Sequence, residues 1–217
     1  MSIHLFYIIT AISYVLMLLV YHLVSRRIAY NRTLQGQVGG NEVALNARHL
    51  FGLLIMLPVI IICFYQKPES VKFVGIFNNT GFYSWFLLIA FATLAFSIKA
   101  GSNTQAIPGL SSISTIPGYL LLRILFLVVY EFYFRIALLH ILPQQYVVLS
   151  ITINVILYGV AHISEPRKIF LLSFPFGVML CAITLISQSV WPAIMIHLLL
   201  SIPYEYKVLV KQKSLTI

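Results

Sequence analysis

The sequence contains very few charged residues. Of its 217 residues only 9% are Asp, Glu, Lys or Arg, and just 5 are acidic, whereas 60% are hydrophobic. The mean hydropathy is +0.97. A water-soluble domain of this length could not cover its surface with such a composition. The composition therefore predicts one integral membrane domain over residues 1–217, whose first partner is the lipid bilayer.

Cysteine is also scarce, and the sequence has no basic patch interleaved with aromatic residues. The two cysteines, Cys63 and Cys181, have apolar neighbours, so we interpret them as small core residues that do not indicate a redox compartment. The absence of the basic and aromatic pattern excludes nucleic acid as a partner. The net charge of +9 is instead explained by membrane topology and by contact with anionic lipid head groups.

Long apolar runs indicate helices, because a helical span needs about 20 mainly apolar residues. Short alternating segments, which are typical of a membrane β-barrel, are not evident. The fold class predicted is an all-α polytopic membrane protein with about seven transmembrane helices and a polar site inside the bundle. The predicted spans are residues 3–23, 49–65, 81–98, 118–142, 145–163, 169–187 and 190–206.

The positions of the basic residues predict the orientation, since Lys and Arg in short loops favour the cytoplasmic side. A cytoplasmic first loop places ten basic residues on one side: Arg26, Arg27, Arg32, Arg48, Lys99, Arg167, Lys168, Lys207, Lys211 and Lys213. Only Lys67 and Lys72 fall on the other side. We therefore expect the N-terminus outside and the C-terminus in the cytoplasm.

The fourth predicted span carries two opposite charges, Glu131 and Arg135. Charges inside hydrocarbon persist when they face the protein interior and have partners. Residues four apart lie on one face of a helix, so we expect an ion pair between these two side chains. Arg123, near the inner end of the same span, is interpreted as a side chain that extends to the lipid head groups.

Two later spans repeat this four-residue spacing of polar groups. Asn154, Tyr158 and His162 form a polar stripe on the fifth span, and His197 and Ser201 lie one turn apart on the seventh. A polar stripe on an apolar helix should face the bundle. Together with the charged pair, these residues predict one shared site within the membrane.

The three motifs resemble the signature of the CPBP intramembrane proteases. That family includes the type II CAAX prenyl endopeptidases and bacterial proteins linked to bacteriocin self-immunity, and its motifs are EExxxR, FxxxH and HxxxN or HxxxD on successive helices. The corresponding runs here are Tyr130-Glu131-x-x-x-Arg135, Tyr158-x-x-x-His162 and His197-x-x-x-Ser201. The resemblance covers roughly residues 118–203, which we expect to form a CPBP-like core in a prokaryotic cell membrane.

The resemblance implies catalytic roles, with two departures from the family pattern. It assigns His162 as the base that activates water, assisted by Glu131 or by the Tyr130 hydroxyl, and it assigns His197 and Ser201 to the oxyanion. However, Tyr130 stands where the first glutamate of the family belongs, and Ser201 replaces the usual amide or carboxylate. Glu131 cannot simply take the missing role, because a shift of one residue turns a side chain by about 100° around a helix.

The sequence leaves open whether a metal takes part. Two histidines and one carboxylate are a common catalytic zinc set, which would here be His162, His197 and Glu131. Arg135 would compete with such a metal for the carboxylate. Metal-free activation of water is the other possibility.

Three function classes follow from these observations. The first is an active CAAX-type endopeptidase whose membrane-proximal or lipidated peptide substrate enters from the cytoplasmic side. The second is an inactive pseudoprotease that keeps the fold as a binding or immunity scaffold. The third, a transporter or channel, is not supported by any symmetric pair of broken helices. The sequence does not indicate an oligomeric state.

Overall fold

The described part of the chain is almost entirely helical. The computed structural model describes residues 3–28, 42–66, 80–103, 116–163, 165 and 167–213, and no strand occurs among them. The α-helices are α1 (Ile3–Ile28), α3 (Glu42–Gln66), α4 (Thr80–Asn103), α5 (Ile116–Phe132), α6 (Val147–Ala161), α7 (Arg167–Ser187) and α8 (Trp191–Lys213). This architecture confirms the predicted all-α class.

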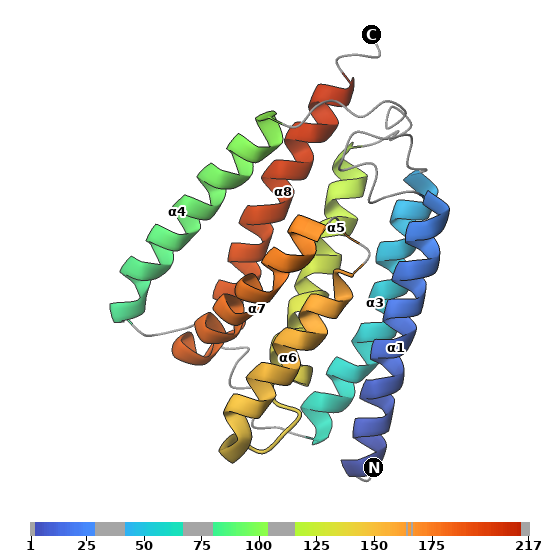
Figure 1. The fold of residues 1–217 in the computed structure, drawn as a ribbon, viewed down its shortest axis with the longest axis vertical. Helices are drawn as coiled ribbons and strands as arrows, with labels where there is room; N and C mark the ends of the chain where they lie inside the picture. Colours follow the sequence, from blue (N-terminus) through green and yellow to red (C-terminus); the bar gives the residue numbers. More distant parts are fainter. Residues whose placement is uncertain are drawn as a thin grey trace.

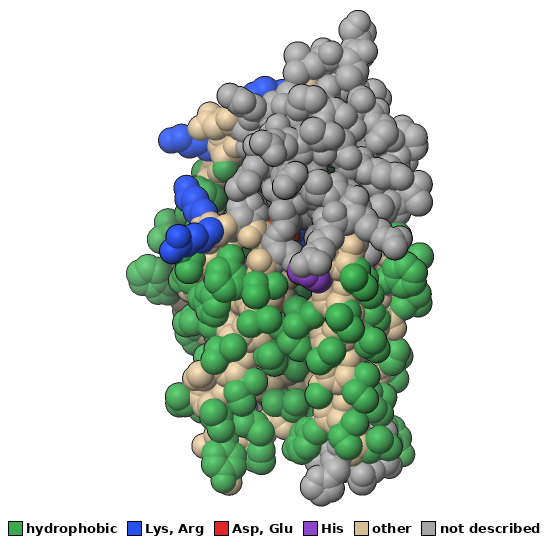
Figure 2. Space-filling view, turned by 45° about the vertical axis from the view of Figure 1, so that its right-hand side comes forward, with side chains coloured by type: hydrophobic (Ala, Val, Ile, Leu, Met, Phe, Trp, Pro, Cys, Tyr) green, Lys and Arg blue, Asp and Glu red, His purple; other side chains and the backbone are tan. Residues whose placement is uncertain are grey.

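Six of these helices are long and apolar enough to cross a membrane. They are the segments Leu5–Leu23, Asn46–Gln66, Gly81–Asn103, Gln144–Ala161, Arg167–Ser187 and Trp191–Lys211. Figure 2 shows a broad hydrophobic surface over most of the molecule, with Lys and Arg side chains gathered toward one end. The protein is therefore an integral membrane protein.

The remaining helix, α5, occupies the centre of the bundle. Its 17 α-helical residues continue directly into a π-helical turn, Tyr133–Leu138. Figure 1 shows α1 and α3 on one side of α5 and α8 with α4 on the other. The predicted fourth span thus ends at Leu138 instead of residue 142, because the chain turns before Pro143. Burial between neighbouring helices explains how α5 carries charges without exposing them to lipid.

Helices α5 and α8 run antiparallel in a register that two polar contacts define. Glu131 on α5 contacts His197 on α8. Arg123, eight residues before Glu131, contacts Glu205, eight residues after His197. The same register sets Leu127 opposite Ser201. The beginning of α5 and the end of α8 therefore lie at the same end of the bundle (Figure 1).

Helix α1 is attached to the central elements by hydrogen bonds. The hydroxyls of Ser13 and Tyr133 are 2.8 Å apart, and the Tyr14 hydroxyl donates to the carbonyl of Leu157 at 2.6 Å. These bonds link α1 to the π-helical turn and to α6. The first helix thus supports the two elements that carry Arg135 and Asn154.

Candidate active site

Glu131 lies at the centre of the polar site, and both of its carboxylate oxygens have partners. Its side chain is fully buried, and Oε2 accepts a hydrogen bond from Nε of Arg135 at 2.9 Å. Oε1 lies 2.5 Å from Nδ1 of His197 on α8. The ion pair predicted from the four-residue spacing is confirmed. Its extension to His197 joins two of the three sequence motifs directly.

Arg135 extends the site from Glu131 to helices α6 and α7. Its Nη1 donates to Oδ1 of Asn154 at 2.6 Å and lies 3.0 Å from Sγ of Cys181. The Cys181 thiol also donates to Asn154 Oδ1 at 3.2 Å. The guanidinium lies 4.9 Å from the centre of the Tyr158 ring. Arg135, Asn154 and Tyr158 therefore lie together, as predicted for the residues that support the site.

The π-helical turn is held in place by Asn154. The amide Nδ2 of Asn154 donates to the carbonyl of Phe134 at 2.6 Å, and the backbone N–H of Leu139 donates to the same carbonyl at 3.0 Å. Turns of this type are rare and occur frequently at functional sites. Here the turn begins two residues after Glu131 and contains Arg135. It is a local distortion of the backbone at the position where the buried ion pair forms.

His162 and His197 border the same two tyrosine rings. The Tyr130 ring lies edge-on to both imidazoles, with ring centres 6.5 Å from His162 and 6.0 Å from His197. The Tyr158 ring centre lies 4.9 Å from that of His162 and 6.4 Å from that of His197. The Tyr130 hydroxyl is buried and has no hydrogen-bond partner. The two histidines thus border one aromatic ring whose buried hydroxyl is unsatisfied.

The hydrogen bonds of the two histidines define the role of each ring nitrogen. Nδ1 of His162 lies 2.8 Å from the carbonyl of Tyr158, and Nδ1 of His197 lies beside Glu131. Carbonyl and carboxylate oxygens only accept, so both Nδ1 atoms carry hydrogen. In a neutral imidazole the other nitrogen, Nε2, is then an acceptor. Each histidine is therefore oriented so that Nε2 can take up a proton.

Ser201 lies outside this hydrogen-bonded network. It is half-buried, one helical turn from His197 on α8. Among the described residues, the bonds that link Arg135, Glu131 and His197 do not extend to Ser201. Ser201 thus keeps the position on α8 that the resemblance gives it, without a contact to the other site residues.

The possible zinc set is not assembled in this structure. Within the described residues, no group of three His, Cys, Asp or Glu side chains lies close enough to hold a metal ion. Glu131 is engaged by Arg135 and His197, and the Tyr130 ring borders both histidines. The set of His162, His197 and Glu131 suggested by the sequence stays a prediction. The contacts show a carboxylate–imidazole pair with a separate second histidine.

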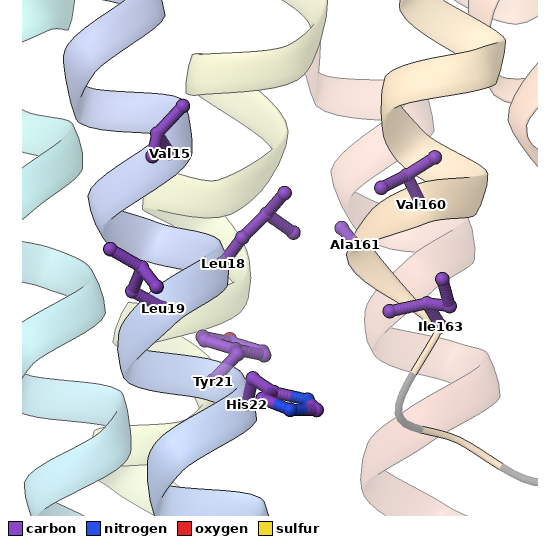
Figure 3. Close-up of a pocket in the computed structure, with 8 residues that line it drawn as sticks. All are labelled: Val15, Leu18, Leu19, Tyr21, His22, Val160, Ala161 and Ile163. Carbon is purple, nitrogen blue, oxygen red and sulfur yellow. The ribbon is translucent and has the colours of Figure 1, made fainter.

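An apolar groove opens beside the site, between α1 and the end of α6 (Figure 3). Its volume is about 320 Å³, and its lining residues are Val15, Leu18, Leu19, Tyr21, His22, Val160, Ala161 and Ile163. Ala161 and Ile163 flank His162 in the chain. The groove therefore lies next to the backbone that carries one of the two site histidines.

Cys181 is the site residue that sequence reasoning missed. Its neighbours in the chain are apolar, so it was interpreted as a core residue, and it is indeed fully buried. What the chain does not reveal is that its thiol faces Arg135 and Asn154. Such a contact depends on how α7 packs against α6 and α5. No spacing within α7 indicates it.

Comparison with known families identifies the segment that carries these residues. Residues 111–202 match the family model described as type II CAAX prenyl endopeptidase Rce1-like. A search of curated proteins and a search of solved structures found no match. The matched segment contains all three motifs and nearly coincides with the predicted core at residues 118–203. Residues 111–202 are therefore similar to the Rce1-like type II CAAX prenyl endopeptidases, in agreement with the resemblance that the motifs indicated.

Proposed function

We propose that this protein is a CAAX-type intramembrane endopeptidase that acts on membrane-proximal or lipidated peptides. The observation that carries the proposal is the buried contact between Glu131 and His197, with His162 nearby and its Nε2 available as an acceptor. These residues come from three helices and converge within the segment that matches the family.

The geometry supports the following division of roles. A water molecule beside Nε2 of His162 transfers a proton to that nitrogen as its oxygen bonds to the peptide carbonyl carbon. The C–N bond then breaks, and His162 returns the proton to the leaving amine. His197, held through Nδ1 by Glu131, donates from Nε2 in its imidazolium form to the developing oxyanion. The Ser201 hydroxyl is the second donor once a substrate occupies the site. Arg135 and Asn154 are positioning residues, since they hold Glu131 and the π-helical turn.

The proposal is tested by cleavage of a farnesylated peptide that ends in a CAAX sequence, using the purified full-length protein. His162→Ala and His197→Ala should each lower the cleavage rate by at least about 100-fold, the lower bound for general acid–base catalysis. His140→Ala is the matched control, because His140 lies beyond the π-helical turn, where its Nδ1 is 3.3 Å from the carbonyl of Ile136. Cleavage that persists in both site variants would refute the mechanism.

A second candidate function, a pseudoprotease that binds the peptide without cutting it, is favoured by Tyr130. Its ring borders both histidines, and its buried hydroxyl has no partner. In this case the wild-type protein binds the peptide but does not cleave it. Tyr130→Glu would then supply the acid of the family motif. Cleavage gained by the folded variant supports this alternative, whereas binding with cleavage by the wild type excludes it.

The proposed function also requires an orientation. We place the N-terminus outside a prokaryotic cell membrane and the C-terminus in the cytoplasm, on the basis of the distribution of Lys and Arg. Single cysteines introduced near each terminus, in a background without Cys63 and Cys181, would report the orientation through their reaction with a membrane-impermeant thiol reagent. Labelling of the C-terminal cysteine in intact cells would contradict this topology.

A further inference from the structure

A second polar cluster lies two helical turns from the Glu131–His197 contact. We call His49, Tyr119, Arg123 and Glu205 the carboxylate cluster. Nε of Arg123 donates to Oε1 of Glu205 at 2.9 Å, and the Tyr119 hydroxyl donates to Oε2 of Glu205 at 2.9 Å. The interpretation of Arg123 as a side chain that reaches the lipid head groups is therefore wrong. Its side chain is 15% exposed and that of Glu205 is 11% exposed.

The cluster also contains a hydrogen-bond donor that has no partner. Nη1 of Arg123 lies 3.4 Å from Nε2 of His49, and a guanidinium has no acceptor, so Nε2 must accept. The proton of the neutral imidazole is then on Nδ1. This atom is buried and makes no hydrogen bond, in a side chain with 1% exposure. A buried donor without a partner is costly, so the polar groups of the cluster are not fully satisfied in this structure.

The donors of the cluster suit a carboxylate. The guanidinium of Arg123 and the phenol of Tyr119 meet at one place, where both hold the carboxylate of Glu205, and the His49 ring lies beside both side chains. Arginine presents a planar fork of five N–H donors that matches carboxylate geometry. Glu205 thus occupies the position that the carboxylate of a ligand would take.

The distance from the active site fits the end of a peptide. Arg123 precedes Glu131 by eight residues on one helix, which corresponds to about 12 Å along its axis. A CAAX sequence has three residues after its cysteine. Three extended residues span roughly 10–11 Å. If the peptide bond to be cleaved lies beside the Glu131–His197 contact, a free C-terminus three residues further along the peptide lies at the level of Arg123.

We propose that the carboxylate cluster binds the free C-terminal carboxylate of the peptide, and that Glu205 fills this subsite until the peptide enters. This inference rests on the proposed function, since it assumes that a peptide lies in the site. Arg123 and Tyr119 exchange the Glu205 carboxylate for that of the peptide, while Nε2 of His49 accepts from Nη1 of Arg123 and holds the guanidinium in place. Residues of α3, α5 and α8 then together select peptides that have a free C-terminus.

The experiment compares two farnesylated, fluorescent peptides that differ only at the C-terminus, one a free acid and one an amide. Binding to the full-length protein in nanodiscs is measured by fluorescence anisotropy, which does not require cleavage. The wild type should bind the acid about tenfold more tightly than the amide, as expected for hydrogen bonds to a charged group. Arg123→Gln should remove this preference, and Glu205→Gln should increase it, because the competing carboxylate is gone.

A matched control removes a different carboxylate at the same end of the bundle. Glu165 pairs with Arg48 at 3.6 Å, and burial raises the pKa of the Glu165 carboxyl while Arg48 opposes that rise. Glu165→Gln should leave the preference for the acid unchanged. If Arg123→Gln fails to fold, Arg123→Lys replaces it in the test. This variant keeps the charge but loses the planar fork of N–H donors and should also remove the preference for the acid.

The outcomes separate this inference from the proposed function. Equal affinity of the wild type for acid and amide would overturn the carboxylate subsite while leaving peptide binding intact. The same conclusion follows if Glu205→Gln does not change the preference. Failure of the wild type to bind either peptide would refute the proposed function and the subsite together.

Discussion

Replacing Glu131 by Gln should destabilise the protein strongly. Arg135 is fully buried, and Glu131 is its charged partner at 2.9 Å, so the variant leaves a guanidinium inside the bundle with only neutral partners. Breaking a buried ion pair by removing one partner costs about 3–5 kcal/mol. Asn154 and Cys181 still contact the guanidinium, which favours the lower part of this range. For a chain of this length the change corresponds to a fall in Tm of roughly 6–20 °C.

A double-mutant cycle tests this prediction. Glu131→Gln, Arg135→Met and the double variant are unfolded in mixed detergent micelles, and the free energies of unfolding are compared with that of the wild type. The double variant should be less destabilised than the sum of the single variants by more than about 1 kcal/mol, because it leaves no buried charge. Additive effects, or a cost of Glu131→Gln below about 1 kcal/mol, would refute the reasoning.

Three further predictions concern stability and follow from single contacts. Tyr130→Phe should change the free energy of unfolding by less than about 1 kcal/mol, because the lost hydroxyl is buried without a partner; a larger loss would reveal a hidden hydrogen bond. Asn154→Leu should cost about 1–3 kcal/mol in the same assay, since Phe134 O and Arg135 Nη1 each lose one of two partners, and Asn154→Asp should cost less if the Arg135 contact dominates. Gly101→Ala should cost about 1–3 kcal/mol, because its Cβ would lie 2.9 Å from Cβ of Lys207 and α4 would have to move away from α8; unchanged stability would mean that α4 is not tightly packed.

Much of the fold and part of the site could be predicted from the chain. The hydrophobic runs predicted helices, and the four-residue spacing predicted the Glu131–Arg135 pair, because both features depend on residues close together in sequence. The motif spacing also predicted the family match at residues 111–202. The end of the fourth span was placed too late, since nothing in the local sequence indicated a π-helical turn over Tyr133–Leu138.

The contacts between helices could not be predicted in the same way. Cys181 was interpreted as a core residue and Arg123 as a residue that reaches the lipid, yet their partners lie 46 positions away at Arg135 and 82 positions away at Glu205. Both interpretations considered one helix at a time. The side chains that meet across a bundle depend on the register and rotation of each helix against its neighbours.

The sequence alone determined that this protein lies in a membrane, that it is helical and that its charges must be paired. Those properties follow from hydrophobicity summed along each segment and from the period of the helix. Only the tertiary structure decided that Glu131 meets His197, 66 residues away, and that Glu205 occupies the donors of Arg123 and Tyr119. The antiparallel register of α5 and α8 produces both contacts, and that register results from the packing of the whole bundle.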